Sequence, residues 1–232
     1  MLNPPASPLK FPRLLLTGAG GNLGKELRPR LKAYCDVLRV SHRRDLGAAA
    51  AGEEVQTAAL EDADQMMALL DGVSAVVHMG GVSTEQPWAP ILAGNIMGMV
   101  NLYEAARLKG VKRIVFASSN HVTGFYRQDE VVNTHMPPKP DGFYGLSKAF
   151  GEDVAQMYWE RWGIETVSIR IGSSTPEPKD RRMLSTWLSL DDLERVVVAA
   201  LTAPIVRHTI IYGVSDNQSS WWDNTHAKHL GY

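Results

Sequence analysis

A glycine-rich turn directly after a short apolar run is the feature that most limits how this chain can fold. Residues 13–17 read Arg-Leu-Leu-Leu-Thr, and the turn reads Gly18-Ala19-Gly20-Gly21-Asn22-Leu23-Gly24. The apolar run predicts a buried parallel strand, and the leucines at Leu27 and Leu31 predict a helix after the turn. Strand, glycine turn and helix in this order favour a dinucleotide-binding fingerprint over an ordinary glycine-rich turn.

Each glycine of this fingerprint has its own expected role. Gly18 allows the tight turn, Gly21 lets the backbone approach a pyrophosphate, and Gly24 lets the helix and the strand pack closely. The predicted helix begins near Asn22 and Leu23, where free backbone amides and the positive end of the helix dipole bind phosphate. We therefore expect these five residues to contact a dinucleotide cofactor.

Length and charge limit the number of domains and the kinds of partner that this chain can have. The chain has 232 residues, is 44% hydrophobic and carries a net charge of -1, which suits one α/β domain without a basic surface. The near-zero net charge argues against a nucleic-acid partner. No apolar run approaches membrane-spanning length, so we expect no membrane partner either. The single cysteine, Cys35, excludes an intramolecular disulfide and fits a cytoplasmic location.

The expected organisation is a flexible N-terminal lead-in, residues 1–12, followed by one domain over residues 13–232. The lead-in contains four prolines and no apolar signal core. The domain is predicted to be a Rossmann-type, doubly wound parallel sheet with flanking helices and small C-terminal substrate-binding elements. Further strands are expected at 36–40, 75–79, 113–117, 165–171 and 208–212, with helices at 63–70, 91–109, 144–162 and 190–203 and an alanine-rich loop leading to Leu60.

The residues after the second strand bear on which cofactor is bound. A carboxylate at this point binds the ribose hydroxyls of NAD, whereas an arginine accommodates the additional phosphate of NADP. The sequence here is Ser41-His42-Arg43-Arg44-Asp45, without the expected acid. Contacts from Arg43 or Arg44 to a phosphate and ordinary solvated loop charges are both open interpretations.

The strand at 75–79 ends in Met79-Gly80-Gly81, followed by Ser83. Ligands of doubly wound sheets lie beyond the carboxyl ends of strands, so these residues are expected to line the adenosine side. His78 lies inside the apolar strand and is expected to be a packed histidine. Asn95 lies among apolar residues of the next helix and either holds the active-site backbone or occupies a surface position.

A polar cluster follows the strand at 113–117, and a Tyr–Lys pair follows later. The cluster reads Ser118-Ser119-Asn120-His121, at the carboxyl end of a central strand. Tyr144 and Lys148 are four residues apart, which places both on one face of the predicted helix. A nearby ammonium favours the phenolate, so we expect Lys148 to lower the pKa of Tyr144.

Together these motifs resemble the uronate dehydrogenase family of the extended short-chain dehydrogenase/reductase superfamily, over essentially all residues from Arg13 onward. The fingerprint and the Tyr–Lys pair are typical of the whole superfamily. Arg170–Ser173 and Trp221–Asn224 also carry the resemblance, and the more specific segments are Ser118–His121 and Arg182–Trp187.

The resemblance implies an oxidoreductase that converts the anomeric carbon of a hexuronic acid, such as D-glucuronate or D-galacturonate, to an aldarolactone by hydride transfer to NAD. Tyr144 would be the base, with Lys148 and Ser119 as the other catalytic residues. NAD contacts would include Asn95 and Ile171 as well as Met79, Gly80 and Gly81. The substrate residues would be Ser83, Ser119, Asn120, His121, Ser173 and Arg182, with Arg182 binding the carboxylate.

The chain departs from the family at two points. The acid after the second strand is replaced by His42, Arg43 and Arg44, so NADP is an alternative cofactor, and the acid usually found near Ala59 is absent. Relatives continue by some tens of residues past the tryptophan motif. We therefore expect substrate-binding loops mainly at 172–189 and in a shortened C-terminal part.

Two other functions are compatible with the same motifs. A sugar or nucleotide-sugar epimerase or dehydratase shares the fold, and a non-catalytic dinucleotide-binding module is a further alternative. No metal site is expected, because His226 and His229 lack a carboxylate partner pattern. Cys35 is expected to be structural, and the protein is expected to form a homo-oligomer.

Overall fold

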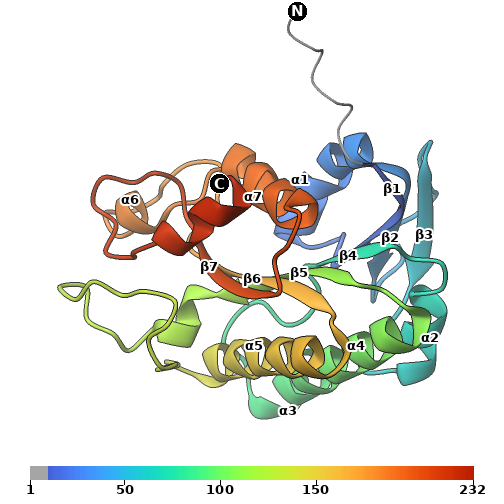
Figure 1. Ribbon diagram of the computed structural model, residues 1–232, viewed down its shortest axis with the longest axis horizontal. Coiled ribbons are helices and arrows are strands. Elements are labelled where there is room, and N and C mark those ends of the chain that lie inside the picture. The colour runs from blue at the N-terminus through green and yellow to red at the C-terminus, as the bar shows by residue number, and fades with distance from the viewer. Residues whose placement is uncertain (1–9) are drawn as a thin grey trace, which may run out of the picture.

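The computed structural model describes residues 10–232 and consists of one parallel sheet between two layers of helices (Figure 1). The seven strands follow the order β3-β2-β1-β4-β5-β6-β7, and every neighbouring pair is parallel. The strands are β1 (Phe11–Thr17), β2 (Cys35–His42), β3 (Glu53–Thr57), β4 (Ala75–His78), β5 (Arg113–Ser119), β6 (Glu165–Ile171) and β7 (His208–Gly213). The predicted doubly wound sheet is confirmed. Residues 1–9 of the expected lead-in lie outside the described residues, and β1 begins within its last part, at Phe11.

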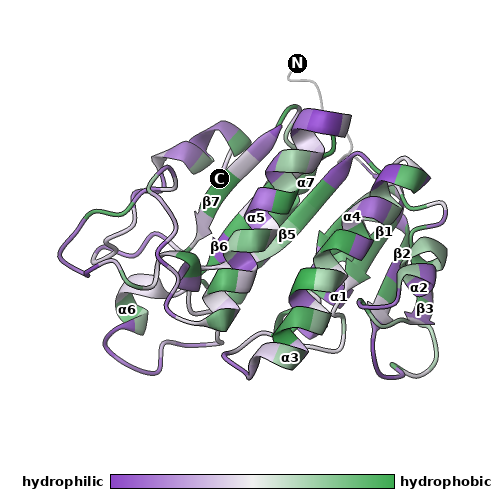
Figure 2. Ribbon diagram, turned by 90° about the horizontal axis from the view of Figure 1, so that it is seen from below, coloured by the Kyte–Doolittle hydropathy of each residue, from purple (hydrophilic) through white to green (hydrophobic). Residues whose placement is uncertain are grey.

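Two hydrophobic clusters hold the layers together. Helices α1 (Asn22–Leu31) and α7 (Leu190–Thr202) cover one face of the sheet. Helices α2 (Ala63–Leu69), α4 (Gly98–Lys109) and α5 (Phe143–Trp162) cover the other. Figure 2 shows this second layer over central strands made largely of hydrophobic residues. The strands therefore face apolar side chains on both sides, as expected for a parallel sheet.

Several predicted helix ends are confirmed. Helices α4 and α5 end at Gly110 and Gly163, whose φ angles of 76° and 65° lie in the left-handed region that glycine adopts without strain. Helix α7 begins after Ser189, whose hydroxyl accepts a hydrogen bond from the backbone of Asp192. The shorter elements are α3 (Trp88–Ile91), α6 (Met183–Thr186), η1 (Lys32–Tyr34), η2 (Leu92–Met97), η3 (Asn120–Thr123) and η4 (Thr225–Leu230).

One expectation about secondary structure was wrong, and one expected helix is longer than predicted. The alanine-rich stretch expected to be a loop contains β3, an edge strand. The helix expected over 91–109 begins earlier, as α3, and passes through the π-helical turn η2 before α4. Within residues 10–232, no helix is both long and apolar enough to cross a membrane.

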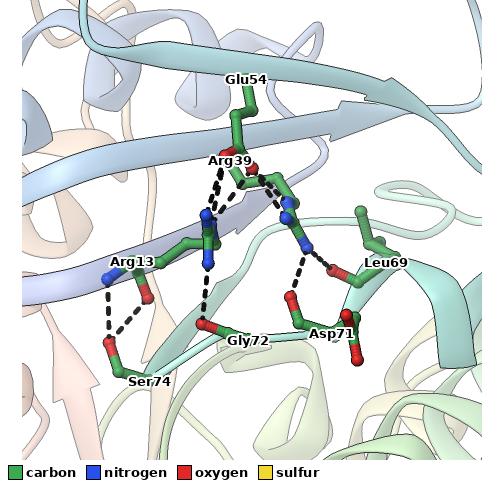
Figure 3. A network of polar contacts seen from close by, with 7 residues as sticks. All are labelled: Arg13, Arg39, Glu54, Leu69, Asp71, Gly72 and Ser74. Carbon is green, nitrogen blue, oxygen red and sulfur yellow. Dashed lines mark hydrogen bonds and ion pairs between the residues drawn. The ribbon is translucent and has the colours of Figure 1, made fainter.

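Strand β3 pairs with β2 in parallel, and a network of ion pairs attaches its side chains to the neighbouring strands (Figure 3). The carboxylate of Glu54 lies 3.0 Å from the guanidinium of Arg13 on β1 and 2.7 Å from that of Arg39 on β2. Arg39 also donates hydrogen bonds to the carbonyl oxygens of Leu69, the last residue of α2, and of Asp71, just after that helix. These contacts attach β3 through charged side chains, so its sequence lacks the apolar pattern by which strands are recognised.

Candidate active site

The glycine turn has the tight geometry predicted for it. Gly18 has a φ of +69°, and a Cβ there would lie 2.5 Å from the carbonyl oxygen of Met79. A Cβ at Gly24 would lie 2.1 Å from the carbonyl oxygen of Gly18, at the point where α1 crosses the turn. Both contacts are closer than a side chain permits, so the predicted roles of Gly18 in the turn and of Gly24 in close packing are confirmed.

The N-terminus of α1 fits a dinucleotide pyrophosphate. Gly21 precedes the helix without a capping side chain, and its first turn contains no acidic residue. A Cβ at Gly21 would meet the Gly18 carbonyl oxygen at 3.2 Å and nothing else within 4 Å. The amides of Asn22 and Leu23 therefore lie at an uncapped, positively polarised helix end, where a phosphate is favoured.

The end of β4 lies directly beside this turn. The hydroxyl of Thr17 accepts a hydrogen bond from the amide of Gly80 at 3.1 Å and lies 2.7 Å from Nδ1 of His78. Burial lowers the pKa of His78 to about 3, and its ring stacks on Phe116. His78 is thus the packed histidine that was predicted. Met79 and Gly80 follow it at the carboxyl edge of the sheet.

Asn95 connects the loop after β4 to helix α5. Its side-chain oxygen accepts a hydrogen bond from the amide of Val82 at 2.7 Å, and its amide group donates to the Val82 carbonyl at 3.1 Å and to the Ser147 hydroxyl at 2.8 Å. Ser147 in turn donates to the carbonyl oxygen of Tyr144 at 2.7 Å. A Cβ at Gly81 would lie 2.6 Å from the Asn95 oxygen. Asn95 therefore has the buried partners that were predicted, and it holds active-site backbone.

Tyr144, Lys148 and Ser119 lie together, but their electrostatics differ from the sequence-based prediction. Burial raises the pKa of Tyr144, while a hydrogen bond with Ser119 opposes the rise. Lys148 Nζ lies 5.7 Å from the centre of the Tyr144 ring and donates to the carbonyl oxygen of Ala117 at 2.7 Å. Burial lowers the pKa of Lys148 itself to about 8. In this structure burial outweighs any lowering of the Tyr144 pKa by Lys148, because it disfavours the charged form of both groups.

His121 lies against Tyr144 and has a carboxylate partner. Its Nδ1 is 2.9 Å from each carboxylate oxygen of Asp141, and its ring meets the Tyr144 ring edge-on with the centroids 5.5 Å apart. A Cβ at Gly145 would lie 2.4 Å from the His121 carbonyl oxygen. Helix α5 can therefore approach this segment closely only because residue 145 is glycine.

A small cavity brings two of the predicted substrate residues together. It has a volume of about 80 Å³, and its lining includes Asn120, Asp141, Arg182 and Trp221. The guanidinium carbon of Arg182 lies 6.0 Å from the centre of the Trp221 ring. Tyr144 is not part of this lining. The cavity is connected to it through Asp141, which contacts His121, whose ring lies against Tyr144.

The other predicted residues lie around these groups. Ser173 pairs with the hydroxyl of Thr186 at 2.9 Å, and Ser83 is exposed in the loop after β4. Ile171 is the last residue of β6 and pairs with Gly213. Arg43 is exposed, just after β2. Neither Ser83 nor Ser173 lines the small cavity around Arg182.

Glu85 and the Glu152–Arg170 pair support the site but were not identified from the sequence. The carboxylate of Glu85 accepts hydrogen bonds from the amides of Phe143 and Tyr144, at 3.0 and 2.9 Å, and so caps α5. Glu152 accepts hydrogen bonds from the hydroxyl of Ser118 and from Arg170. The absence of a capping side chain at Gly142 was the available signal for a distant cap, although it does not reveal which residue supplies it.

A much larger cavity, about 800 Å³, lies elsewhere along β7 and is separate from these residues. Its lining includes His135, Arg207, His226 and His229. The rings of His135 and His229 lie 5.1 and 5.0 Å from that of His226. Within residues 10–232, no group of three or more His, Cys, Asp and Glu side chains is arranged to hold a metal ion. We therefore place the candidate active site at the Tyr144 cluster, which lies at the same carboxyl edge of the sheet as the glycine turn.

Comparisons with known proteins agree with this geometry. The model of the NAD dependent epimerase/dehydratase family matches residues 14–206. A uronate dehydrogenase of Pseudomonas putida is 58% identical over 223 residues, which cover 96% of this chain and 83% of that protein. The crystal structure of a glucuronic acid dehydrogenase from Chromohalobacter salexigens matches with a TM-score of 0.94 and 49% identity, covering 96% of this chain and 84% of that one. A variant uronate dehydrogenase of Agrobacterium tumefaciens, complexed with NAD, matches with a TM-score of 0.94 and 46% identity, covering 97% and 84%. The fingerprint, the Tyr144 cluster and these relatives together show that the chain belongs to the NAD-dependent epimerase/dehydratase family and, within it, to the uronate dehydrogenases.

Proposed function

We propose that the protein oxidises the anomeric carbon of a free hexuronic acid, D-glucuronate or D-galacturonate, to the aldarolactone, with NAD as the hydride acceptor. The observation that carries this proposal is the grouping of a buried phenol, a serine hydroxyl and a lysine at the carboxyl edge of the sheet, next to a turn that fits a dinucleotide. Relatives that share most of the chain bear the name of this activity.

In this proposal Tyr144 takes the proton of the anomeric hydroxyl, and Ser119 donates a hydrogen bond to the reacting oxygen. Lys148, anchored on the Ala117 carbonyl, holds the cofactor's ribose and supplies positive charge near the phenol when it is protonated. NAD, when bound, accepts the hydride that leaves the anomeric carbon. The substrate thus loses one hydride and one proton, which leaves the lactone carbonyl.

Substrate recognition is assigned to the groups around the small cavity. Arg182 binds the uronate carboxylate, since a guanidinium can hold a carboxylate through two parallel hydrogen bonds. Asn120 and His121 bind sugar hydroxyls, and the Asp141 carboxylate fixes the orientation of the His121 ring. Ser83 and Ser173, which lie outside the lining of this cavity, are assigned further contacts with the sugar.

The cofactor contacts are assigned to the turn and to the neighbouring strand ends. Backbone amides around Gly21 and Leu23 bind the pyrophosphate, and the segment from Met79 to Gly81 lies along the adenosine. Asn95 keeps the following backbone in place through its contacts with Val82. Ile171 contributes an apolar contact at the end of β6.

Initial rates with glucuronate and galacturonate, compared with nucleotide sugars, test this proposal. We expect NAD-dependent turnover of both free uronic acids. Replacing Tyr144 with Phe should lower kcat by at least about 100-fold, within the range of general-base effects. Tyr158→Phe is the matched control, because Tyr158 lies on the same helix and its hydroxyl bonds to Glu104 instead.

Two results would contradict the proposal. If Tyr144→Phe kept the kcat of the wild-type protein, Tyr144 would not be the base. If only nucleotide sugars were turned over, the protein would be an epimerase or dehydratase of the same fold. The homo-oligomeric state and the cytoplasmic location remain predictions, and light scattering of the purified protein tests the first of them.

A further inference from the structure

The loop after β2 lies directly over the fingerprint turn. A Cβ at Gly20 would lie 2.9 Å from the Leu46 side chain and 3.1 Å from the His42 ring. Leu46 also packs against the hydrophobic cluster beneath α1. These contacts hold residues 42–46 at the carboxyl end of β2. In a dinucleotide-binding fold this is where the adenosine ribose lies, with its 2′ position facing the residues after β2.

The charged groups at this point are almost all positive. His42 Nδ1 accepts a hydrogen bond from the amide of Arg44 at 3.1 Å, which leaves the two arginine side chains exposed beyond the ring. Within residues 10–232 neither Arg43 nor Arg44 forms an ion pair. The carboxylate of Asp45, the nearest acid in the chain, accepts a hydrogen bond from the amide of Gly47.

The surroundings of His42 show the same excess of positive charge. Burial lowers the pKa of His42, and the charges of Arg43, Arg44 and Lys25 lower it further. Lys25 lies in the first helical turns of α1, beside the predicted pyrophosphate site.

The neighbouring strand does not supply the missing acid either. His42 pairs with Thr57 at the end of β3, and the next residues along the chain are Ala58 and Ala59. The amide of Ala58 donates to the His42 carbonyl at 3.2 Å, so this segment runs alongside the end of β2. Both positions nearest to an adenosine ribose therefore lack a carboxylate that would bind ribose hydroxyls and repel a phosphate.

We propose that His42, Arg43 and Arg44 form a binding site for the 2′-phosphate of NADP, so that this chain uses NADP as well as NAD. Two unpaired guanidinium groups can each give charge-assisted hydrogen bonds to phosphate oxygens. The proposal rests on the proposed function for its substrate, but the phosphate site itself depends only on the loop after β2.

Equilibrium binding of adenosine 2′,5′-bisphosphate and of 5′-AMP, measured by calorimetry, tests the site without any turnover. The two ligands differ only in the 2′-phosphate. We expect the bisphosphate to bind at least about tenfold more tightly, since a single hydrogen bond to a charged group can account for a factor of this size. The difference should shrink at high salt, because the groups are exposed.

Single variants locate the effect. Arg43→Ser and Arg44→Ser should each weaken bisphosphate binding several-fold, up to about tenfold, and leave 5′-AMP binding unchanged within about twofold. Arg161→Ser is the matched control, because it removes one exposed positive charge at the far end of α5. His42→Asp should restore a carboxylate after β2 and lower kcat/KM with NADP relative to NAD.

Equal affinities of the wild-type protein for the two ligands would overturn the proposal, as would equal losses in the arginine variants and in Arg161→Ser. The two levels of inference can be told apart. Uronate oxidation with NAD alone, together with equal binding of the two adenosine ligands, would refute the phosphate site and leave the proposed function standing. Selective bisphosphate binding in a protein without uronate turnover would refute the proposed function and support the phosphate site.

Discussion

The buried ion pair between Glu152 and Arg170 links the stability of the fold to the end of β5. The two side chains are only 4% and 1% exposed. Arg170 donates hydrogen bonds of 2.9 and 2.8 Å to the two carboxylate oxygens, and the Ser118 hydroxyl donates a third at 2.6 Å. Because Ser118 immediately precedes Ser119, the pair lies directly behind a proposed catalytic residue.

Replacing Glu152 with Ala should be strongly destabilising. It leaves the Arg170 guanidinium buried without a counter-charge, and removing one partner of a buried pair costs about 3–5 kcal/mol. In a domain of this size each kcal/mol changes the Tm by about 2–4 °C, so we expect a fall of roughly 6–20 °C. Thermal unfolding followed by circular dichroism, with urea midpoints as a second measurement, determines the size of the loss.

A double variant separates loss of charge from loss of packing. In Glu152→Met/Arg170→Met both charges are removed and most of the volume is kept, so most of the lost stability should return. The control is Asp129→Ala, which breaks the exposed pair with Arg127 and should cost at most about 1 kcal/mol. A loss in Glu152→Ala no greater than in this control, or a double variant less stable than the single one, would refute the reasoning.

Three further predictions concern helix α5. Glu85→Ala should lower kcat a few-fold with little change in KM, because a lost helix cap costs about 0.5–2 kcal/mol and moves the segment that carries Tyr144. Glu160→Ala, on the last turns of the same helix, is its control, and equal kinetics in the two variants would count against a positioning role. The free energy of unfolding of the wild-type protein should rise with pH between about 8, the pKa of folded Lys148, and its ordinary value of 10.5, because in this window the unfolded chain binds more protons. Lys148→Met should lose this slope in urea denaturation, and an unchanged slope would contradict the assignment. In the cofactor-free protein, an ultraviolet difference titration against Tyr144→Phe should show the Tyr144 phenolate only above about pH 10, the ordinary pKa of the phenol, because burial raises it. Ionisation at lower pH would show that another group stabilises the phenolate.

The sequence was sufficient to predict groups that depend on local periodicity or on the ends of parallel strands. Tyr144 and Lys148 share a helix face because they are four residues apart, and Ser119 meets them because it ends a central strand. The left-handed ends of α4 and α5 were predictable because glycine adopts that conformation without strain. In these cases the structure follows from residues close together in the sequence or from the common edge at which parallel strands end.

The features that could not be predicted depend on residues far apart in the chain. Glu85 caps an amide 59 residues later, and nothing in the sequence near either position indicates the contact. Strand β3 has the sequence Glu-Glu-Val-Gln-Thr, which lacks the apolar pattern that predicts a strand. Glu54 in this strand instead forms ion pairs with Arg13 and Arg39, on two strands that are distant in the sequence. The rise in the Tyr144 pKa could not be predicted either, because spacing gives the separation of two groups but not their burial.

Burial has opposite effects on the pKa values of Tyr144 and Lys148, and this has a consequence for the proposed mechanism. It raises the first and lowers the second to about 8, so both shifts disfavour a phenolate beside an ammonium. Within the described chain, Ser119 is the group that acts in the other direction on Tyr144. In the proposed mechanism, a bound oxidised nicotinamide would supply positive charge close to the phenol and so favour the phenolate. The proposed mechanism would thereby favour proton removal from the sugar when the hydride acceptor is bound.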